Sequence, residues 1–184
     1  MFGDEGSAYW IAREGLTLCS RMSDGRAPRG ALYELVRQHF ALDGDLDLCA
    51  AIYGQNAAVR SQFASLAKLV AQAADAGDGL AQALFVRAAG EFAEIIGRVR
   101  KILGVPASEE LLLSYSGGLF QRRELILAPL RSALAANGAS YSCHRAPPGP
   151  RAWRRAARDH AERRAARCSR ARRTRRALAE YRRD

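Results

Sequence analysis

The run Gly3-Asp4-Glu5-Gly6-Ser7-Ala8-Tyr9-Trp10-Ile11 is the most informative stretch of this 184-residue sequence. It places two acidic residues between two glycines and leads directly into a helix predicted over residues 8–22. A tight turn of this kind exposes carboxylates beside a helix N-terminus, where they accept hydrogen bonds from sugar hydroxyls or hold a metal-bound water. The spacing alone favours a simpler interpretation, in which Asp4 and Ser7 only cap the helix.

Further helices are predicted between this turn and the middle of the chain. Their ranges are residues 30–40, about 45–53 and 58–75, and Asp78 is placed to cap a long helix over 79–103. The long helix has an apolar residue at nearly every turn, namely Leu80, Leu84, Ala88, Phe92, Ile95, Val99 and Leu103. Such a stripe predicts a core element and carries no catalytic group.

A second informative stretch joins a strand to a glycine turn. Leu111-Leu112-Leu113-Ser114-Tyr115 is typical of a short buried strand, and Ser116-Gly117-Gly118 closes it. A helix is predicted over 121–136, and a second strand over 139–143. The order of strand, glycine turn, helix and strand is that of a parallel α/β unit, so the predicted fold class is α/β and helix-rich.

The basic character of the chain lies in its C-terminal segment. Residues 1–143 carry 14 Lys and Arg against 15 Asp and Glu, whereas residues 144–184 carry 15 Arg against 4 acids and supply the net charge of +10. After Pro147-Pro148-Gly149-Pro150 the composition is mainly Arg and Ala without an apolar stripe. We therefore expect a domain over 1–143 and a disordered tail over 144–184.

Two other interpretations of this tail stay open. Its arginines would bind phosphates, so one alternative is a nucleic-acid-binding protein, and incidental binding to RNA or DNA is expected in any case. Arginine without lysine, mixed with Ala and Pro, is also what GC-rich DNA encodes when it is read out of frame. The second hypothesis is therefore that the tail is a frameshifted sequence on a truncated gene product.

The sequence argues against a membrane protein and a cysteine-based metal site. No apolar stretch approaches the roughly 18 residues of a membrane span, and Asp4 and Glu5 stand where a signal peptide needs a basic and then an apolar segment. The four cysteines, at positions 19, 49, 143 and 168, show no C-x-x-C pair or zinc-like spacing. We expect a cytoplasmic protein with free thiols, no membrane partner and no metal ligands.

The run from Gly3 to Ile11 resembles the signature of N-acetylglucosamine kinases and of the related BadF/BadG/BcrA/BcrD ATPase family. That family has an actin-like, ribonuclease-H-like fold in which two lobes clamp ATP. The resemblance implies that Asp4 contacts the sugar, and that Gly3, Glu5 and Gly6 shape the turn around it. Ser116-Gly117-Gly118-Leu119-Phe120 resembles the adenosine motif of the same superfamily. It implies that Gly117 and Gly118 approach the nucleotide and that Ala74 lines the adenine pocket.

The resemblance covers about residues 1–143 and corresponds to the C-terminal lobe alone. It implies an ATP-dependent kinase that phosphorylates N-acetylglucosamine or glucosamine, with ATP and Mg²⁺ as the family's cofactors. The family's phosphate loops and its catalytic aspartate lie in the other lobe, so no catalytic residue is assigned and the expectation is a chain that is inactive alone. The alternative within the fold is a BadF/BadG-type ATPase activator. Exposure of the interlobe face also predicts self-association.

Overall fold

The computed structural model describes residues 4–45, 47–53 and 60–146, together with Arg155, Arg158 and Glu162. Contacts within the chain separate it into two compact units. The first comprises Met1–Leu113 and Gly117–Cys143, and the second comprises Ser114–Ser116 and His144–Asp184. All the helices considered below belong to the first unit. Most of the predicted tail, including the Pro-rich stretch at 147–150, lies outside the described residues.

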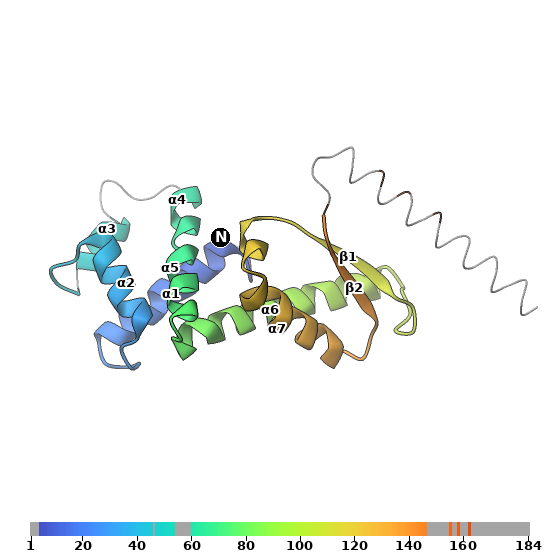
Figure 1. The fold of residues 1–184 in the computed structure, drawn as a ribbon, viewed down its shortest axis with the longest axis horizontal. Coiled ribbons are helices and arrows are strands. Elements are labelled where there is room, and N and C mark those ends of the chain that lie inside the picture. Colours follow the sequence, from blue (N-terminus) through green and yellow to red (C-terminus); the bar gives the residue numbers. More distant parts are fainter. Residues whose placement is uncertain are drawn as a thin grey trace, which may run out of the picture. The chain divides into compact units, whose positions relative to one another are not determined.

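The first three helices follow the predicted ranges closely. They are α1 (Ala8–Ser23), α2 (Ala31–Phe40) and α3 (Asp47–Tyr53), shown in blue to cyan in Figure 1. The Ser7 hydroxyl accepts a hydrogen bond from the backbone N–H of Trp10 at 3.2 Å, so the predicted capping role of Ser7 is confirmed. Because this bond satisfies an otherwise unpaired donor of the first turn, it fixes where α1 begins.

The helix predicted over 58–75 is interrupted. The structure has α4 (Arg60–Ser65) and α5 (Ala67–Asp75), separated at Leu66. At the break, the N–H of Leu66 donates to the Phe63 carbonyl at 3.0 Å, and the N–H of Leu69 donates to the Leu66 carbonyl at 2.9 Å. Each of these hydrogen bonds joins residues three positions apart, as in a 3₁₀ helix, and this spacing tightens the backbone locally. The residue pattern gave no signal for the break, because no glycine or proline marks it.

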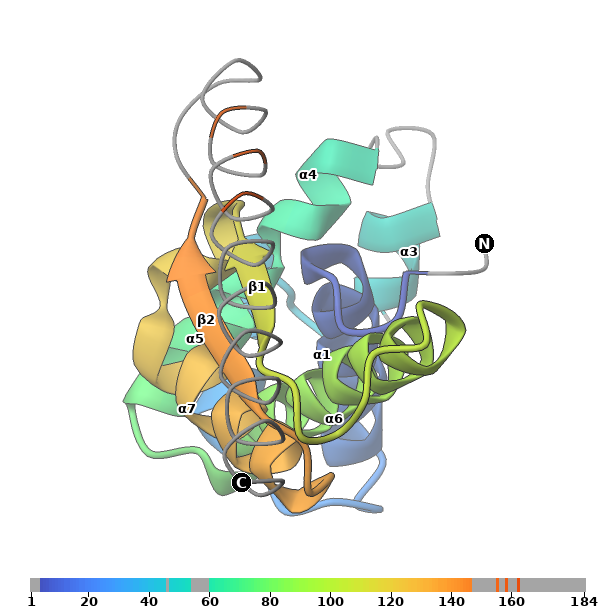
Figure 2. The same ribbon diagram turned by 90° about the vertical axis from the view of Figure 1, so that its right-hand side faces the viewer.

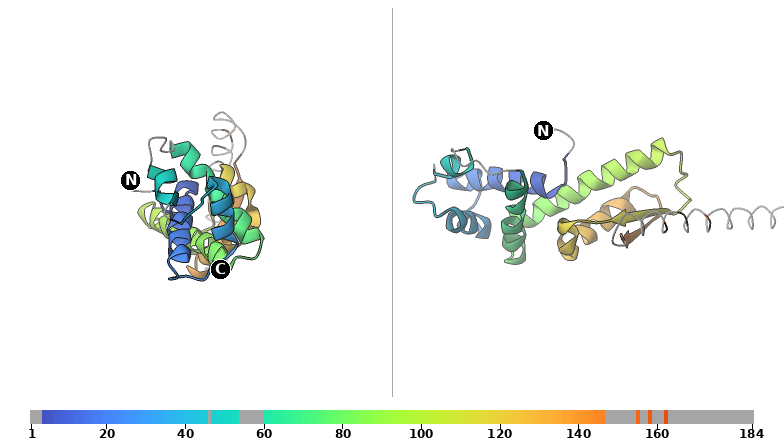
Figure 3. Two further views of the ribbon diagram at one scale, coloured as in Figure 1. Left: turned by 90° about the vertical axis from the view of Figure 1, so that its left-hand side faces the viewer. Right: turned by 90° about the horizontal axis from the view of Figure 1, so that it is seen from above.

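Asp78 caps two helices at once. Its Oδ1 accepts hydrogen bonds from the N–H groups of Leu80 and Ala81, both at 3.1 Å, at the start of α6 (Gly79–Ile102). Its Oδ2 accepts a third bond at 3.0 Å from the N–H of Leu32, in the first turn of α2. The predicted cap of α6 is confirmed, and the same carboxylate ties the α5–α6 turn to α2. Figure 3 shows α6 as one unbroken green helix that begins beside α5.

The buried face of α6 differs from the predicted apolar stripe. Leu84 and Ala88 are buried as predicted, but Ile95, Val99 and Leu103 are 48%, 44% and 64% exposed. The buried residues of the helix are Ala81, Leu84, Phe85, Ala88, Ala89, Ala93 and Arg100. In its last turns α6 packs against the backbone of a loop rather than against apolar side chains, and there the prediction was wrong.

Arg100 explains this difference. Its side chain is 4% exposed and donates to the carbonyl oxygens of Val105 at 3.3 Å, Ser140 at 2.9 Å and Ala107 at 3.3 Å, and also to those of Pro106 and Glu109. A guanidinium carries N–H donors in a fixed planar fork, so one side chain can satisfy several buried carbonyls. Arg100 thus holds the loop after α6 and the entry to the second strand together.

The predicted strand–helix–strand unit is present. It consists of β1 (Leu111–Tyr115), the 3₁₀ turn η1 (Gly118–Gln121), α7 (Arg123–Ala136) and β2 (Tyr141–Arg145). The strands pair directly, with the N–H of Leu111 bonded to the Ser140 carbonyl at 3.0 Å and that of Ala146 to the Tyr115 carbonyl at 2.8 Å. This register is parallel, and Figure 2 shows the two strands side by side. The fold is thus a helix-rich α/β arrangement with a small parallel sheet.

The hydrophobic core of the first unit is built mainly from helix faces. Residues of α1, α2, α5, α6 and α7 contribute to it, and α6 and α7 pack along each other. The largest fully buried side chains are Phe85, Ile11, Met22, Leu32, Ile126 and Val36. Many of the remaining buried positions are alanines, which let the helix backbones approach closely.

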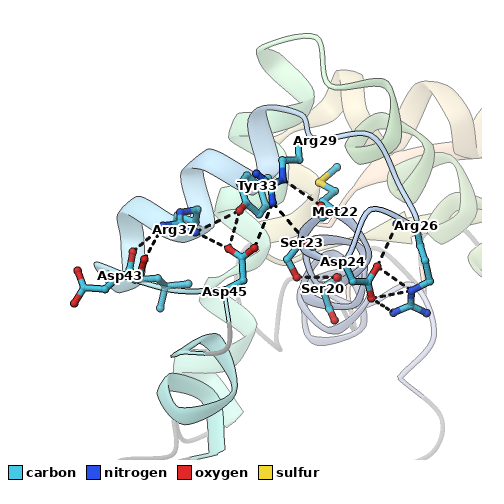
Figure 4. A network of polar contacts seen from close by, with 11 residues as sticks. Ser20, Met22, Ser23, Asp24, Arg26, Arg29, Tyr33, Arg37, Asp43 and Asp45 are labelled. Carbon is cyan, nitrogen blue, oxygen red and sulfur yellow. Dashed lines mark hydrogen bonds and ion pairs between the residues drawn. The ribbon is translucent and has the colours of Figure 1, made fainter.

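A polar network fixes the loop after α2 (Figure 4). Asp45 accepts a hydrogen bond from the Tyr33 hydroxyl at 2.7 Å and pairs with Arg37, and Arg29 reaches it at 3.4 Å. The guanidinium of Arg29 also lies 4.5 Å from the centre of the Tyr33 ring. Asp45 belongs to the loop, whereas Arg29, Tyr33 and Arg37 belong to α2 or lie next to it. The network therefore holds the loop against this helix.

Candidate functional site

The first glycine turn is held against the middle of α6. The Asp4 carbonyl accepts a hydrogen bond from the Ser7 N–H at 2.9 Å, and Gly6 has a φ of +79°. Gly6 is buried, and a Cβ built on it would lie 2.9 Å from the Ala88 carbonyl oxygen and 3.2 Å from the Phe92 ring. Only glycine meets both conditions, the left-handed backbone and the close approach.

The two acidic residues of this turn differ in their exposure to solvent. Asp4 is partly buried and Glu5 is exposed, whereas Gly3 lies outside the described residues. The turn therefore places one half-buried and one exposed acidic residue beside the start of α1. The assignment of Asp4, Glu5 and Gly6 to sugar binding stays a prediction.

The second glycine turn leaves backbone open to solvent. Gly117 has a φ of +103°, which favours glycine, and Gly118 begins η1. A Cβ built on either residue would meet no atom within 4 Å. The glycine at 117 is required by the backbone, whereas the glycine at 118 leaves space that a ligand can occupy.

A cavity of about 510 Å³ lies beside the start of α1 and the second glycine turn, and Asp4, Glu5, Gly6 and Gly117 are not among the residues that line it. Ala8, which belongs to the first motif and is the first residue of α1, lines it, and Gly118 and Leu119 of the second motif line it too. The other walls come from α4, α5, α6 and the start of α7, through Ala64, Ser65, Ala67, Lys68, Ala71, Gln72, Phe85, Gln121 and Arg122. Motifs about 110 residues apart thus share one site of a size suited to a small organic ligand.

Helix α5 contributes to the cavity through a face that the sequence analysis did not identify. Ala74, predicted to line the adenine pocket, is 1% exposed and is not among the residues that line the cavity. Lys68, Ala71 and Gln72 line it instead, at the i, i+3 and i+4 positions of one helix face. The signal that identifies them is their position beside the apolar face of α5, where a long polar side chain rims a buried surface.

The polar groups of the cavity favour an anionic or amide-rich ligand. Lys68 and Arg122 are the cationic side chains among its described lining residues, and no carboxylate is among them. Arg122 also pairs with Asp75 at the end of α5, so its guanidinium is oriented from that side. The cavity can hold a phosphorylated or carboxylated molecule, with Gln72 and Gln121 offering amide donors and acceptors.

An aromatic pair connects the two turns. Phe92, which touches Gly6, stacks on Phe120 of η1 with ring centroids 5.9 Å apart and an interplanar angle of 29°. Phe120 lies two residues after Gly118, in the same 3₁₀ turn. Phe92 had been predicted only as part of the core stripe of α6, and its connection to the second turn depends on tertiary packing.

Cys19 and Cys143 do not add a reactive thiol to this site. Burial raises the pKa of the Cys19 thiol to about 11, and burial also raises the pKa of Cys143. Both thiols are therefore protonated near neutral pH, in the form that is a poor nucleophile. Within the described part of the chain, no group of three or more His, Cys, Asp or Glu residues is arranged to hold a metal ion.

Comparisons with known proteins point in one direction. Residues 1–147 match the BadF/BadG/BcrA/BcrD ATPase family. The N-acetyl-D-glucosamine kinase of Dictyostelium discoideum is 28% identical over 126 residues, which are 68% of this chain and 40% of that protein. The crystal structure of a putative N-acetylglucosamine kinase from Chromobacterium violaceum is similar with a TM-score of 0.54 and 32% sequence identity. That match covers 74% of this chain and 46% of the other.

The chain therefore spans less than half the length of both of these proteins. Within the described residues, no helix is long and apolar enough to cross a membrane.

Proposed function

The chain belongs to the BadF/BadG/BcrA/BcrD ATPase family, and on that premise we propose that it forms the C-terminal, substrate-binding lobe of an amino-sugar kinase. The proposed reaction is ATP-dependent phosphorylation of N-acetylglucosamine or glucosamine. The names of the two similar proteins support the sugar, and the family description supports ATP.

One observation carries this proposal, namely that Ala8 and Gly118 line the same cavity. A kinase must bring its two substrates together, because transfer needs donor and acceptor held in contact. In our proposal Asp4 accepts hydrogen bonds from sugar hydroxyls, while Gly117 and Gly118 let the nucleotide approach the backbone. The proposed partners of the nucleotide across the cavity are Lys68 and Gln72 of α5.

The cavity fits a nucleotide better than it fits a metal ion. Its volume and its Lys68 and Arg122 side chains suit a nucleoside with phosphate groups, whereas none of its described lining residues is a carboxylate that could bind Mg²⁺. ATP, when bound, supplies the phosphoryl group. The residues described here bind and orient, and no general base is assigned among them.

Calorimetry with the purified chain tests the proposal. We expect ATP and N-acetylglucosamine to bind, and Gly118→Val to weaken ATP binding at least about tenfold, because its side chain occupies open space at the cavity wall. Gly90→Val is the matched control, since Gly90 is exposed on α6, is not among the residues that line the cavity and has no atom within 4 Å of its built Cβ.

Unchanged ATP affinity in Gly118→Val, or no binding of either ligand to the wild-type chain, would contradict the proposal. Release of ADP, measured on the same samples, shows separately whether these residues suffice for turnover. Our expectation is that they do not, because the described cavity lacks an acidic side chain placed to take the sugar proton.

The activator alternative is less well supported by the described residues. An iron–sulfur cluster needs several cysteine thiolates gathered at one place, whereas Cys19, Cys49 and Cys143 lie on α1, α3 and β2. Absence of cluster incorporation after anaerobic reconstitution with iron and sulfide would separate this alternative from the kinase proposal.

The proposed macromolecular partners of the chain are a second copy of itself and, as a prediction, nucleic acid. We propose that the chain self-associates through the apolar face at the end of α6, formed by Ile95, Val99, Ile102 and Leu103. Nucleic-acid binding by the arginine-rich tail stays a prediction, because that segment lies largely outside the described residues. A steep loss of binding to single-stranded RNA between low and moderate salt would support it.

A further inference from the structure

Phe92 is in contact with both glycine turns, although it belongs to neither motif. It lies near the middle of α6, one turn after Ala88. On one side its ring carbons come within 3.2 Å of the position that a Cβ on Gly6 would occupy. On the other side the ring stacks on Phe120 at a centroid distance of 5.9 Å.

The neighbouring residues leave each turn little freedom to move alone. Gly6 is buried, and a Cβ built on it would meet both the Ala88 carbonyl and the Phe92 ring, so the sugar turn cannot come closer to α6 without displacing the ring. Phe120 belongs to the short 3₁₀ turn that starts at Gly118, so a shift of its ring moves the backbone that lines the cavity. Protein interiors are close-packed, and a displaced ring passes its displacement to whatever it touches.

We propose that Phe92 is a positioning residue that couples the sugar turn to the nucleotide turn through its stack on Phe120. Occupancy of one turn then favours the conformation of the other that binds its ligand, which is a coupling free energy between two sites. The inference rests on the proposed function in one respect, that each turn holds a substrate.

The first experiment measures this coupling directly. The dissociation constant of ATP is determined by calorimetry with and without saturating N-acetylglucosamine, and the ratio is the coupling factor. We expect Phe92→Leu, which keeps an apolar side chain but removes the ring, to reduce this factor about three- to tenfold. Phe120→Leu should do the same, and the double variant should add little, because both changes break one stack.

Two control variants separate coupling from general damage. Phe92→Tyr keeps the ring and should retain the coupling factor. Phe40→Leu removes a half-buried ring at the end of α2, where it packs edge-on against His39, and should also leave the factor unchanged. An unchanged coupling factor in Phe92→Leu overturns the proposal, because the ATP affinity would then respond to N-acetylglucosamine as it does in the wild-type chain even though the ring stack is lost.

The second experiment needs no ligand, so it keeps the failure of this proposal distinct from a failure of the proposed function. Hydrogen exchange is followed at the amide of Ser7, bonded to the Asp4 carbonyl, and at that of Arg122, bonded to the Leu119 carbonyl. We expect Phe92→Leu to speed exchange at both amides relative to Phe40→Leu. Faster exchange at the Ser7 amide without faster exchange at the Arg122 amide overturns the proposed coupling of the two turns through Phe92. This outcome does not depend on whether the wild-type chain binds ATP or sugar.

Discussion

At the scale of single residues, Gly6 and Gly25 offer a matched comparison. Their φ angles are +79° and +81°, but a Cβ on Gly25 meets nothing within 4 Å, whereas one on Gly6 meets the Ala88 carbonyl at 2.9 Å. We expect Gly25→Ala to cost about 1–2 kcal/mol of unfolding free energy through its backbone alone. Gly6→Ala should cost about 1–3 kcal/mol more, because a backbone oxygen cannot move aside as a side chain does.

Urea unfolding followed by circular dichroism measures this difference between the two variants. Equal losses in Gly6→Ala and Gly25→Ala would mean that the first glycine turn is not pressed against α6. The position of Gly6 in the candidate site would then need another explanation.

The acid dependence of stability should depend on Asp45. The Tyr33 hydroxyl, with Arg37 beside it, holds the pKa of the Asp45 carboxyl below its ordinary value of 3.8. A carboxyl whose pKa is lowered by folding stabilises the protein above its unfolded pKa, and this stabilisation is lost as the pH falls through the folded value. Between about pH 5 and pH 3, Asp45→Asn should therefore lose less stability than the wild-type chain.

Asp24→Asn provides the control for this measurement. The pKa of Asp24 is also lowered, by its hydrogen bond with Arg26, but this pair is open to solvent and its side chains are 44% and 58% exposed. Solvent screens such a pair, so its removal should change the acid limb less than Asp45→Asn does. A steeper acid limb in Asp45→Asn than in wild type would contradict the assignment.

Residue-level prediction from the sequence succeeded where a local backbone rule applied. The helix cap at Ser7 and the exposed glycine turn at Gly117 follow from rules about neighbouring residues, and the structure contains both. Lys68, Gln72 and Phe92 were missed as site residues because their roles arise from segments far apart in the sequence. Periodicity assigns such residues to a helix face, but it does not say what that face meets.

At the scale of secondary-structure elements, the crossing of α1 and α5 depends on Gly15. A Cβ built there would lie 2.4 Å from Cγ2 of Val70, whose β-branched side chain has little freedom to turn away. Alanine is the better helix former by about 1 kcal/mol, yet we expect Gly15→Ala to destabilise the protein by about 1–2 kcal/mol net, because the overlap costs more than the propensity gains.

A double-variant cycle checks this explanation. Val70→Ala removes the overlapping methyl groups, so Gly15→Ala should cost markedly less, or nothing, in its presence. Gly90 is exposed on α6, and a Cβ built there has open space, so Gly90→Ala should be neutral or stabilising by up to about 1 kcal/mol. If the single variant Gly15→Ala is more stable than the wild-type chain, α1 and α5 are free to move apart and the explanation is wrong.

Helix and strand ranges were predictable because their start and stop signals are local. Asp78 before α6 and the apolar run of β1 are examples of such signals, and both elements begin where predicted. The break at Leu66 and the buried Arg100 were not predictable in this way. They depend on what packs against them, because Arg100 is buried to satisfy the carbonyls of a loop that periodicity treats as solvent.

At the scale of the whole molecule, the first glycine turn, the Gly117-Gly118 pair and the cavity lined by Ala8 and Gly118 all belong to the first compact unit. The proposed binding functions can therefore be measured on this chain, although it spans less than half the length of the two similar proteins. The complete reaction needs donor, acceptor and a proton acceptor held together. Binding by this chain is therefore a property separate from turnover.

Self-association is the last property that we predict, and it follows from one face of α6. Ile95, Val99, Ile102 and Leu103 recur at helical spacing and are between 44% and 71% exposed. A contiguous apolar stripe of this kind promotes association of chains, whereas single exposed apolar residues do not. We expect the apparent mass in sizing chromatography with light scattering to rise with protein concentration.

Lysines on this face should suppress that rise. Val99→Lys with Ile102→Lys places two charges on the stripe, and cations near the end of a helix also suit its dipole, so the fold should tolerate them. Val86→Lys is the control, because Val86 is 58% exposed on the same helix but on another face, 13 residues from Val99. If the control lowers the apparent mass as much as the double variant, association does not run through this stripe. If the wild-type chain is monomeric at all concentrations, the face at the end of α6 does not bind a second copy.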